Sequence, residues 1–264
     1  MYYLSLYWGF VRIRWRTQSQ FRGAFIMTAI SKIAGFGAQF LTVFLLVSRF
    51  GSLGGWTADQ VLSLFALNSI TYALGACFGF HTARAFDNMA RDGSLDGILT
   101  KPVNPFLYIL SNRFSSGYVG NLIISIVCLV IGLTRVGTPM SPFHIGMLAL
   151  ALVGGSMIHG SAMILFSIPA MWNPQAELRS LFYNNFRNMS DYPINIYPAF
   201  FRVLMTWVLP YAFIAFYPAQ AIFGIAPLYH SSLQFVSPIV GLILCFLTYR
   251  LFWYGVKRYQ GTGT

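Results

Sequence analysis

The chain has 264 residues, of which 56% are hydrophobic and only 9% are charged, and it carries a formal net charge of +11. Soluble domains carry about 25% charged residues, so this composition excludes an ordinary soluble fold. The excess of Lys and Arg is typical of membrane-protein loops that face the cytoplasm and anionic lipid, so we expect membrane lipids as partners and no nucleic acid.

Residues 1–22 precede the first long apolar stretch and predict a helix that lies along the cytoplasmic membrane surface. Trp8 and Trp15 in this segment suit the headgroup region. A soluble N-terminal extension is the alternative. The apolar stripe of the predicted interfacial helix is made by Tyr3, Leu6, Tyr7, Phe10 and Ile13.

Long apolar stretches recur through the rest of the chain, and each is long enough for a helix that crosses about 30 Å of hydrocarbon. The predicted fold class is therefore all-α, a polytopic integral membrane protein with six transmembrane helices in a single domain over residues 1–264. The predicted spans are residues 24–48, 61–83, 116–134, 143–172, 201–223 and 235–254.

The basic residues alternate between the gaps, which predicts the orientation of the spans. Fourteen lie in alternate gaps or at the chain ends, and only Arg49 and Arg135 lie in the opposite gaps. This imbalance places both termini in the cytoplasm. The fourteen are Arg12, Arg14, Arg16, Arg22, Arg84, Arg91, Lys101, Arg113, Arg179, Arg187, Arg202, Arg250, Lys257 and Arg258.

Lys32 and His159 are polar side chains inside predicted spans, and both are candidates for the transport path. Lys32 either faces a cavity or a partner, or snorkels from the membrane edge. His159 lies in a run of small residues, where a hydrogen bond to a neighbouring helix is favoured over a proton relay. None of the six acidic residues lies in the middle of a predicted span, which counts against coupling to an ion gradient.

Two gaps on the predicted cytoplasmic side are long enough to carry structure, residues 84–105 and residues 173–200. The first contains two Asp-Gly turn signals, a short apolar face that includes Leu95 and Leu99, and Pro102, which stops a helix. It predicts a short, rigid helical projection, with an ordinary solvated loop as the alternative.

Pro210 and Pro218 lie in the fifth predicted span, where each removes a backbone donor and is expected to kink or break a helix. Such a break forms either a gate or a re-entrant turn, or else a static kink. The sequence holds no phosphate-binding loop, no metal-ligand cluster and no nucleophile elbow. We therefore expect no catalytic residues, no metal site and no cofactor in this chain.

At three patches the chain resembles the permease subunits of ABC-2 type exporters, and is most similar to the short six-span branch encoded beside a separate ATPase. The family has an acidic-Gly, Leu, Leu, Pro segment after its second span. The three patches are residues 91–105, the proline-containing segments within 192–219, and the terminal Tyr-Gln-Gly-Thr-Gly of residues 259–263.

This resemblance implies a division of labour. Two permease subunits, as a homodimer or a heterodimer, form the translocation path, and two cytoplasmic ABC ATPases bind ATP and Mg²⁺. The loop after span two carries a coupling helix that docks on the ATPase, and the N-terminal helix resembles the family's connecting helix. The residues that this likeness places at the ATPase contact are Asp92, Gly93, Leu95, Asp96, Leu99, Lys101 and Pro102.

The resemblance also implies export from a plasma membrane, and we expect a bacterial inner membrane. The outer gaps at residues 49–60 and 224–234 are too short for an external domain, which favours a small amphipathic or hydrophobic cargo. The alternative functions are a secondary transporter or channel driven by an ion gradient, a membrane enzyme that acts on lipid, and an assembly factor without cargo.

Overall fold

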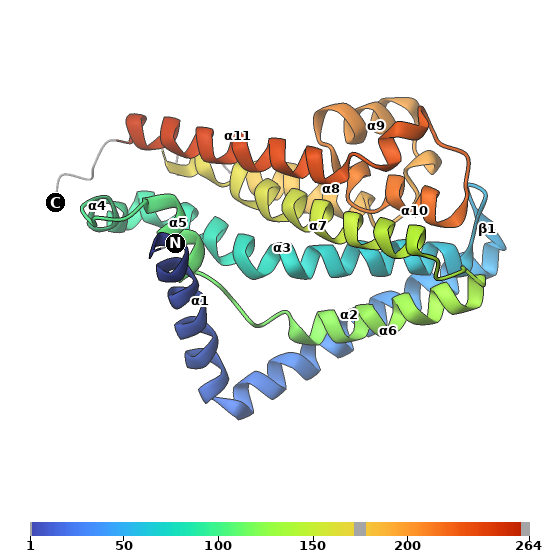
Figure 1. The fold of residues 1–264 in the computed structure, drawn as a ribbon, viewed down its shortest axis with the longest axis horizontal. Coiled ribbons are helices and arrows are strands. Elements are labelled where there is room, and N and C mark those ends of the chain that lie inside the picture. Colours follow the sequence, from blue (N-terminus) through green and yellow to red (C-terminus); the bar gives the residue numbers. More distant parts are fainter. Residues whose placement is uncertain (1, 172–177, 260–264) are drawn as a thin grey trace.

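The computed structural model describes residues 2–171 and 178–259, and most of this part of the chain is helical (Figure 1). Its first half contains α1 (Tyr2–Gln20), α2 (Arg22–Phe50), β1 (Ser52–Leu53), β2 (Trp56–Thr57), α3 (Ala58–Asp92), α4 (Ser94–Leu99), α5 (Pro105–Asn112) and α6 (Val119–Val136). Its second half contains α7 (Pro142–Leu165), η1 (Ile168–Met171), η2 (Arg179–Asn184), α8 (Asn185–Met189), η3 (Ile194–Ile196), α9 (Ala199–Val203), η4 (Leu204–Val208), η5 (Tyr211–Phe213), α10 (Phe216–Phe223), η6 (Ser231–Gln234) and α11 (Ser237–Arg258).

Helix α3 is the centre of the bundle, between the pair α2 and α6 on one side and α7 with α11 on the other (Figure 1). Within the described residues, five helices are long and apolar enough to cross a membrane, or six if the bent pair of helical segments in residues 199–223 counts as one span. The five are α2, α3 as far as Phe86, α6, α7 continued through η1, and α11. Within them, the apolar part of α3 is 78% buried and that of α2 only 17%. Helix α3 therefore touches its neighbours along its length, whereas much of α2 faces outward.

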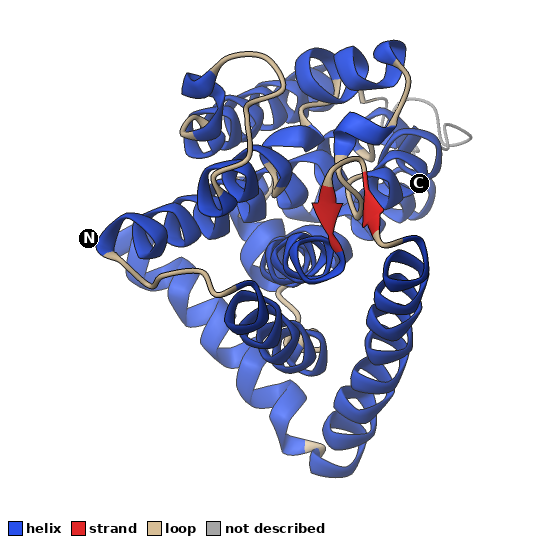
Figure 2. Cartoon of the chain, turned by 90° about the vertical axis from the view of Figure 1, so that its right-hand side faces the viewer, coloured by secondary structure: helices blue, strands red, loops and turns tan. Residues whose placement is uncertain are grey.

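One end of the bundle carries α4 and both ends of the described chain, and the other carries the strands β1 and β2 (Figure 1). The strands form an antiparallel hairpin between α2 and α3, with Ser52 opposite Thr57 (Figure 2). Thr57 then caps α3, because its side chain accepts from the Gln60 backbone while the Gln60 side chain accepts from the Thr57 backbone. We call the two ends the α4 end and the hairpin end.

Close approach of α3 and α7 depends on glycine. A Cβ atom on Gly75 would lie 2.7 Å from the Ser156 carbonyl oxygen and 2.8 Å from the His159 Cβ. The run of small residues around His159 therefore does what its composition predicts, which is to let two helices pack closely. This contact holds His159 against α3.

Residues 179–196 run along α3 from the α4 end to the hairpin end, which differs from the cytoplasmic loop predicted over 173–200. Residues 173–177 lie outside the described chain. The remainder is a polar segment that lacks the apolar run by which a span is recognised, and several of its polar side chains form hydrogen bonds or an ion pair inside the bundle. Its successive contacts with the first half of the chain are Arg179 beside Ala83, Arg187 over Tyr72, Asp191 bonded to Asn68, and Asn195 bonded to Gly54.

The stretch predicted as a single fifth span, residues 201–223, is instead broken into two helical arms. Its two arms, Ala199–Val208 and Tyr211–Phe223, meet at 78°. Both outer ends lie at the hairpin end, since Asn195 bonds Gly54 and the ring of Trp56 contacts those of Phe216 and Phe223. The Tyr211 hydroxyl at the bend donates to the Phe182 carbonyl oxygen, so the tip points into the bundle. The segment therefore enters and leaves by the same end.

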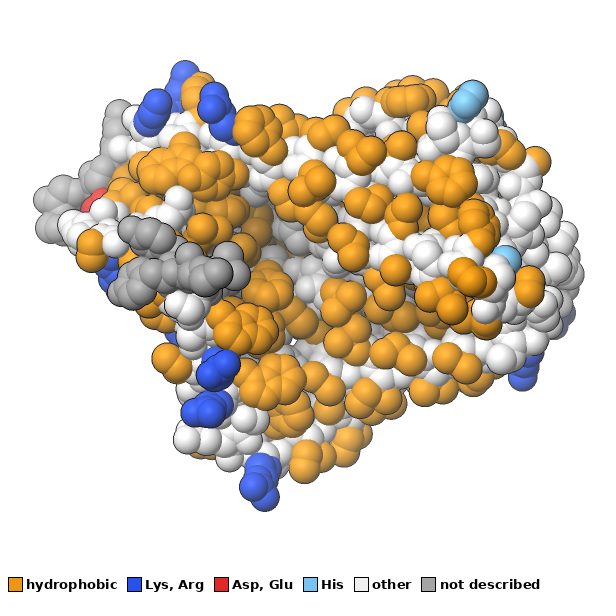
Figure 3. Space-filling view, in the orientation of Figure 1, with side chains coloured by type: hydrophobic (Ala, Val, Ile, Leu, Met, Phe, Trp, Pro, Cys, Tyr) orange, Lys and Arg blue, Asp and Glu red, His pale blue; other side chains and the backbone are white. Residues whose placement is uncertain are grey.

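Basic side chains gather at the α4 end of the face drawn in Figure 3, while hydrophobic side chains cover its middle. Two arginines that the sequence assigned to the cytoplasmic gaps lie elsewhere. Arg187 lies inside the bundle, and Arg202 belongs to α9 at the hairpin end. Their displacement follows from residues 179–196 running the length of the bundle.

Helix α1 turns away from α2 at Phe21 and lies against α5 (Figure 1). Two side chains attach it to the end of α5 and to the residues that follow: Arg14 donates to the Asn112 side-chain oxygen at 3.0 Å, and the Gln18 side-chain oxygen accepts from the Ser116 backbone at 2.7 Å. Its position at a membrane surface stays a prediction.

Candidate functional site

Helix α4 projects from the bundle as a short helix held by one buried side chain. Gly93 has a φ of +68°, which lets the chain leave α3 and turn directly into α4. Leu95 is 0% exposed and packs with Phe86, Met89 and Phe252 at the α4 end. The projection therefore has a fixed attachment to α3 and α11, and its outer side remains open.

The predicted coupling residues divide into an inner and an outer group. Leu95 faces the chain's own core, so it anchors α4 and does not form part of an open surface. Its predicted place at or near the ATPase contact stays a prediction. Asp96, Lys101 and Pro102 are exposed, and Leu99 is half-buried. The side chain of Asp92 lies outside the part of the chain that the structure describes.

Asn104, in the loop after α4, joins three helices, and no sequence pattern singled it out. Its side-chain oxygen accepts from the Leu107 backbone and caps α5, while its side-chain nitrogen donates to the Tyr249 hydroxyl of α11 at 3.0 Å. Its backbone N–H donates to the Tyr7 hydroxyl of α1 at 3.2 Å. The loop that follows α4 is thereby tied to both terminal helices.

A second set of polar residues lies buried in the bundle between α3, α7 and residues 179–196. The Asn68 side-chain nitrogen donates to Asp191 Oδ1 at 2.6 Å, and the Asn68 oxygen lies 3.1 Å from His159 Nε2. His159 Nδ1 lies 3.1 Å from the Tyr183 hydroxyl. We call Asn68, His159, Tyr183, Arg187 and Asp191 the interior network.

The order of hydrogen bonds fixes the donors in this network. An ionised carboxylate only accepts, so Asn68 turns its NH₂ to Asp191 and its oxygen to His159. His159 Nε2 therefore carries a hydrogen, and in the neutral ring Nδ1 accepts from the Tyr183 hydroxyl. The interpretation of His159 as a partner in hydrogen bonds between helices agrees with this geometry.

Arg187 supplies the positive charge beside Asp191. Its Nη2 lies 3.9 Å from Asp191 Oδ1, and its guanidinium lies 4.2 Å from the centre of the Tyr72 ring. The Arg187 side chain is 13% exposed and that of Asp191 only 4%. This is an ion pair in the interior, where losing one partner strands the other charge.

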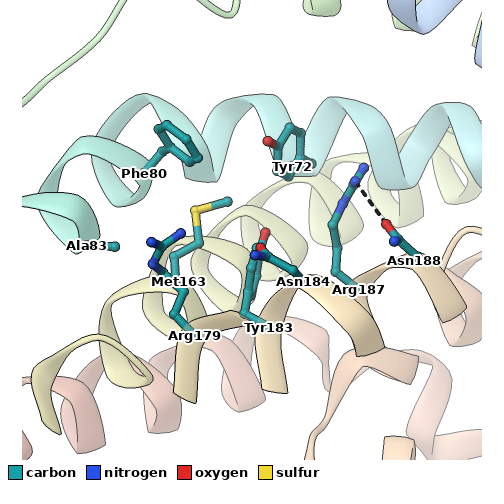
Figure 4. A pocket seen from close by; sticks show the side chains of 9 residues that line it. All are labelled: Tyr72, Phe80, Ala83, Met163, Arg179, Tyr183, Asn184, Arg187 and Asn188. Atoms are coloured by element: carbon teal, nitrogen blue, oxygen red, sulfur yellow. Dashed lines mark hydrogen bonds between the residues drawn. The ribbon is translucent and has the colours of Figure 1, made fainter. Parts of the chain in front are cut away.

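A cavity of about 240 Å³ opens next to this pair (Figure 4). Tyr72, Phe80 and Ala83 of α3 form one wall, and Met163 of α7 contributes from a second helix. Arg179, Tyr183, Asn184, Arg187 and Asn188 complete the lining. The cavity combines aromatic faces with two arginines, which suits a molecule that has apolar and polar parts.

Comparison with known proteins decides the class of this site. A family model described as "ABC-2 family transporter protein" matches residues 33–263. The chain belongs to the ABC-2 transporter family. A search of curated proteins and a search of solved structures each gave no match.

Family membership makes this ABC-2 chain a multi-pass membrane protein and a transport subunit that is not itself catalytic. ABC-2 permeases generally work with an ABC ATPase. The resemblance noticed at three sequence patches is thus confirmed as a family relationship. Of the third patch, only Tyr259 is in the described chain.

The remaining predicted path residues of this ABC-2 chain lie in different places. Lys32 is half-buried, and its Nζ lies 5.3 Å from the centre of the Tyr118 ring, so it faces α6 rather than open lipid. Pro210 lies at the bend between the two helical arms of residues 199–223. Pro218 is the third residue of α10, where the backbone N–H of a helix has no intrahelical partner. The prediction that Pro218 kinks or breaks a helix is therefore wrong.

The interior network was missed because its members come from distant parts of the sequence. Asn68 and Asp191 are 123 positions apart. One signal could have found it. Arg187 and Asp191 stand four residues apart, at helical spacing, and no other charged residue occurs between Arg179 and Arg202.

Proposed function

We propose that the chain is the permease subunit of an ATP-binding cassette exporter that moves a small amphipathic or hydrophobic compound out through the plasma membrane of a bacterium. It pairs with a second permease subunit, and a separate cytoplasmic ABC ATPase binds and hydrolyses ATP with Mg²⁺. The chain itself contributes the path and the attachment for the motor.

The observation that carries this proposal is the structure of α4 in a chain that belongs to the ABC-2 family. Asp96 and Pro102 are exposed, whereas Leu95 locks the same short helix to the core. A partner that grips the exposed side would therefore move α3 rather than a loose loop.

Helix α3 gives such a movement a route into the bundle. It is a single helix of 35 residues that starts at the hairpin end and reaches α4 through Gly93. It carries Asn68 and Tyr72, which contact Asp191 and Arg187 of residues 179–196. Displacement of α4 thus changes the spacing of the two segments that flank the 240 Å³ cavity, which is how closure of the ATPase opens the path.

The short segments at the hairpin end support a small cargo. The connection between α2 and α3 contains only the two-stranded hairpin. The connection from α10 to α11 contains only the short helix η6. Neither forms a receiving domain for a polymer.

Co-purification from membranes tests the attachment of the motor. Leu99→Glu places a carboxylate at a half-buried position of α4, beside the cluster that holds Leu95, and we expect the ATPase to be lost while the permease still inserts at the normal level. Asp96→Lys, which reverses an exposed charge, should act in the same direction. Met140→Glu is the matched control, because Met140 is exposed near the hairpin end. Full ATPase recovery with both α4 variants would contradict this assignment.

The interior network favours one second candidate, transport driven by an ion gradient. Asp191 lies in the bundle interior and connects through Asn68 to His159. The absence of acidic residues from the predicted spans therefore no longer counts against coupling to an ion gradient. The two candidates differ in their energy source. Transport that needs ATP and survives collapse of the proton and sodium gradients supports the exporter, and transport without the ATPase that stops with the gradients supports the second candidate.

A further inference from the structure

An open cavity of about 560 Å³ lies at the α4 end, beside the start of α4, and its polar wall is strongly basic. Arg84, Arg113 and Arg179 meet there from three segments: α3, the residue after α5, and η2. The other polar lining residues are His81, Asn88 and Ser94. Among the described lining residues there is no carboxylate.

The guanidinium groups of Arg84 and Arg113 on one cavity repel each other, and an anion between them relieves that repulsion. Arginine presents a planar fork of N–H donors that matches phosphate in two parallel hydrogen bonds. The amide of Asn88 adds a neutral donor on the same wall. The lining therefore has the chemistry of a phosphate site.

The position of the cavity along the membrane normal indicates which molecule carries the phosphate. The candidate span in α3 covers Ala58–Phe86 and has 29 residues. At 1.5 Å per residue its length is roughly 43 Å, which matches a bilayer with its headgroup layers. Arg84 lies in the last turn of this span, and Ser94 lies beyond it, so the cavity coincides with the headgroup layer.

We propose that this cavity binds the phosphate of an anionic lipid headgroup, with free phosphate as the other source of the same chemistry. Arg84 and Arg113, both exposed, reach the phosphate from α3 and from the end of α5. Arg179 also lines the 240 Å³ cavity, so the bound headgroup lies next to that cavity. The bound lipid bridges α3 and residues 179–196 at the end where α4 is attached.

Native mass spectrometry of the full-length chain tests this proposal with two probes that have identical acyl chains, dioleoyl phosphatidic acid and dioleoylglycerol. We expect phosphatidic acid to bind in preference. The double variant Arg84→Gln/Arg113→Gln should weaken its binding by at least roughly tenfold, as expected for loss of charged hydrogen bonds. Arg49→Gln, in the last turn of α2 at the hairpin end, is the matched control and should bind as the wild type does.

Ser94→Asp is a second variant that tests the site without removing an arginine. Ser94 is exposed at the start of α4, where a carboxylate is tolerated, but the added charge should repel the phosphate. Its melting temperature is expected to equal that of the wild type while phosphatidic acid binding falls.

Inorganic phosphate as competitor separates the two sources. Weak competition supports a lipid headgroup, and displacement at equal concentration supports free phosphate at the same arginines. Equal binding of dioleoylglycerol and phosphatidic acid would overturn the proposal, as would full phosphatidic acid binding by folded Ser94→Asp and by the double arginine variant.

Discussion

The α4 projection and the interior network hold their polar groups in opposite ways. Around α4 the charged side chains of Asp96 and Lys101 are exposed, and one apolar residue, Leu95, provides the anchor. In the interior network the charges of Arg187 and Asp191 are themselves the buried elements. Exposed charges are free to meet a partner at little cost, whereas buried charges hold residues 179–196 in one register on α3. The first region is suited to attachment and the second to sensing displacement.

Replacing Asp191 by Ala is expected to have the largest effect on stability, a loss of about 3–5 kcal/mol, because Arg187 would keep a buried charge without its carboxylate. The melting temperature in detergent measures it. Asp59→Ala is the control, since Asp59 pairs with an Arg135 side chain that is 55% exposed and its loss should cost at most about 1 kcal/mol. Equal losses in the two variants would remove the contrast between buried and exposed charges.

Replacing Leu95 by Ala should rank next. We expect it to lower the free energy of unfolding by about 2–5 kcal/mol, because it leaves a cavity where a side chain of α4 was fully buried. The comparison is Leu99→Ala on the same helix, where the side chain is only half-buried and the loss should be smaller. Thermal unfolding of both variants measures the difference. If Leu99→Ala proved the more damaging, the anchor would be assigned to the wrong residue.

Replacing Gly75 by Ala tests the close packing that holds His159 against α3. The new methyl group would meet the Ser156 carbonyl oxygen at 2.7 Å, and overpacking of this kind costs about 1–3 kcal/mol. Gly146→Ala in α7 is the matched control because it has nothing within 4 Å, so better helix propensity should leave stability unchanged or raised. A neutral Gly75→Ala would show that the helices are not in close contact there.

Replacing Asn104 by Ala should have the smallest effect, about 0.5–2 kcal/mol, through loss of the α5 cap. Asn104→Asp keeps the accepting oxygen but loses the donor to Tyr249. It should therefore retain most of the cap and weaken only the link to α11. Equal melting temperatures for the Ala variant and the wild type would contradict a role for Asn104 in joining the helices.

The α4 projection could be predicted from the sequence because its signals are local. The Asp-Gly pair at Gly93, the short apolar face and Pro102 all lie within a few residues of one another. The sequence does not predict which residue of that face is buried, because the burial of Leu95 depends on packing with Phe252 of α11. Local patterns determine that a helix forms, and distant packing determines which residues it exposes.

The path of residues 179–196 could not be predicted because polarity was read as solvent exposure. Asp191 forms an ion pair with Arg187 and accepts a hydrogen bond from Asn68 inside the bundle, so the segment needs no apolar run to lie there. The aromatic and proline-containing stretch after it was apolar enough to be taken for the span. The chain instead bends by 78° at Pro210, and the contacts of Phe216 and Phe223 with Trp56 place its second arm at the hairpin end.

The central claim is that this ABC-2 chain is a conduit driven by a separate ATPase attached at α4. Uptake of a fluorescent amphiphile into inside-out vesicles tests it most directly, using vesicles with the chain and its ATPase, with the chain alone, and with Leu99→Glu and the ATPase. The account predicts ATP-dependent uptake only in the first. Concentrative uptake by the chain alone, or undiminished ATP-dependent uptake with Leu99→Glu, would contradict it.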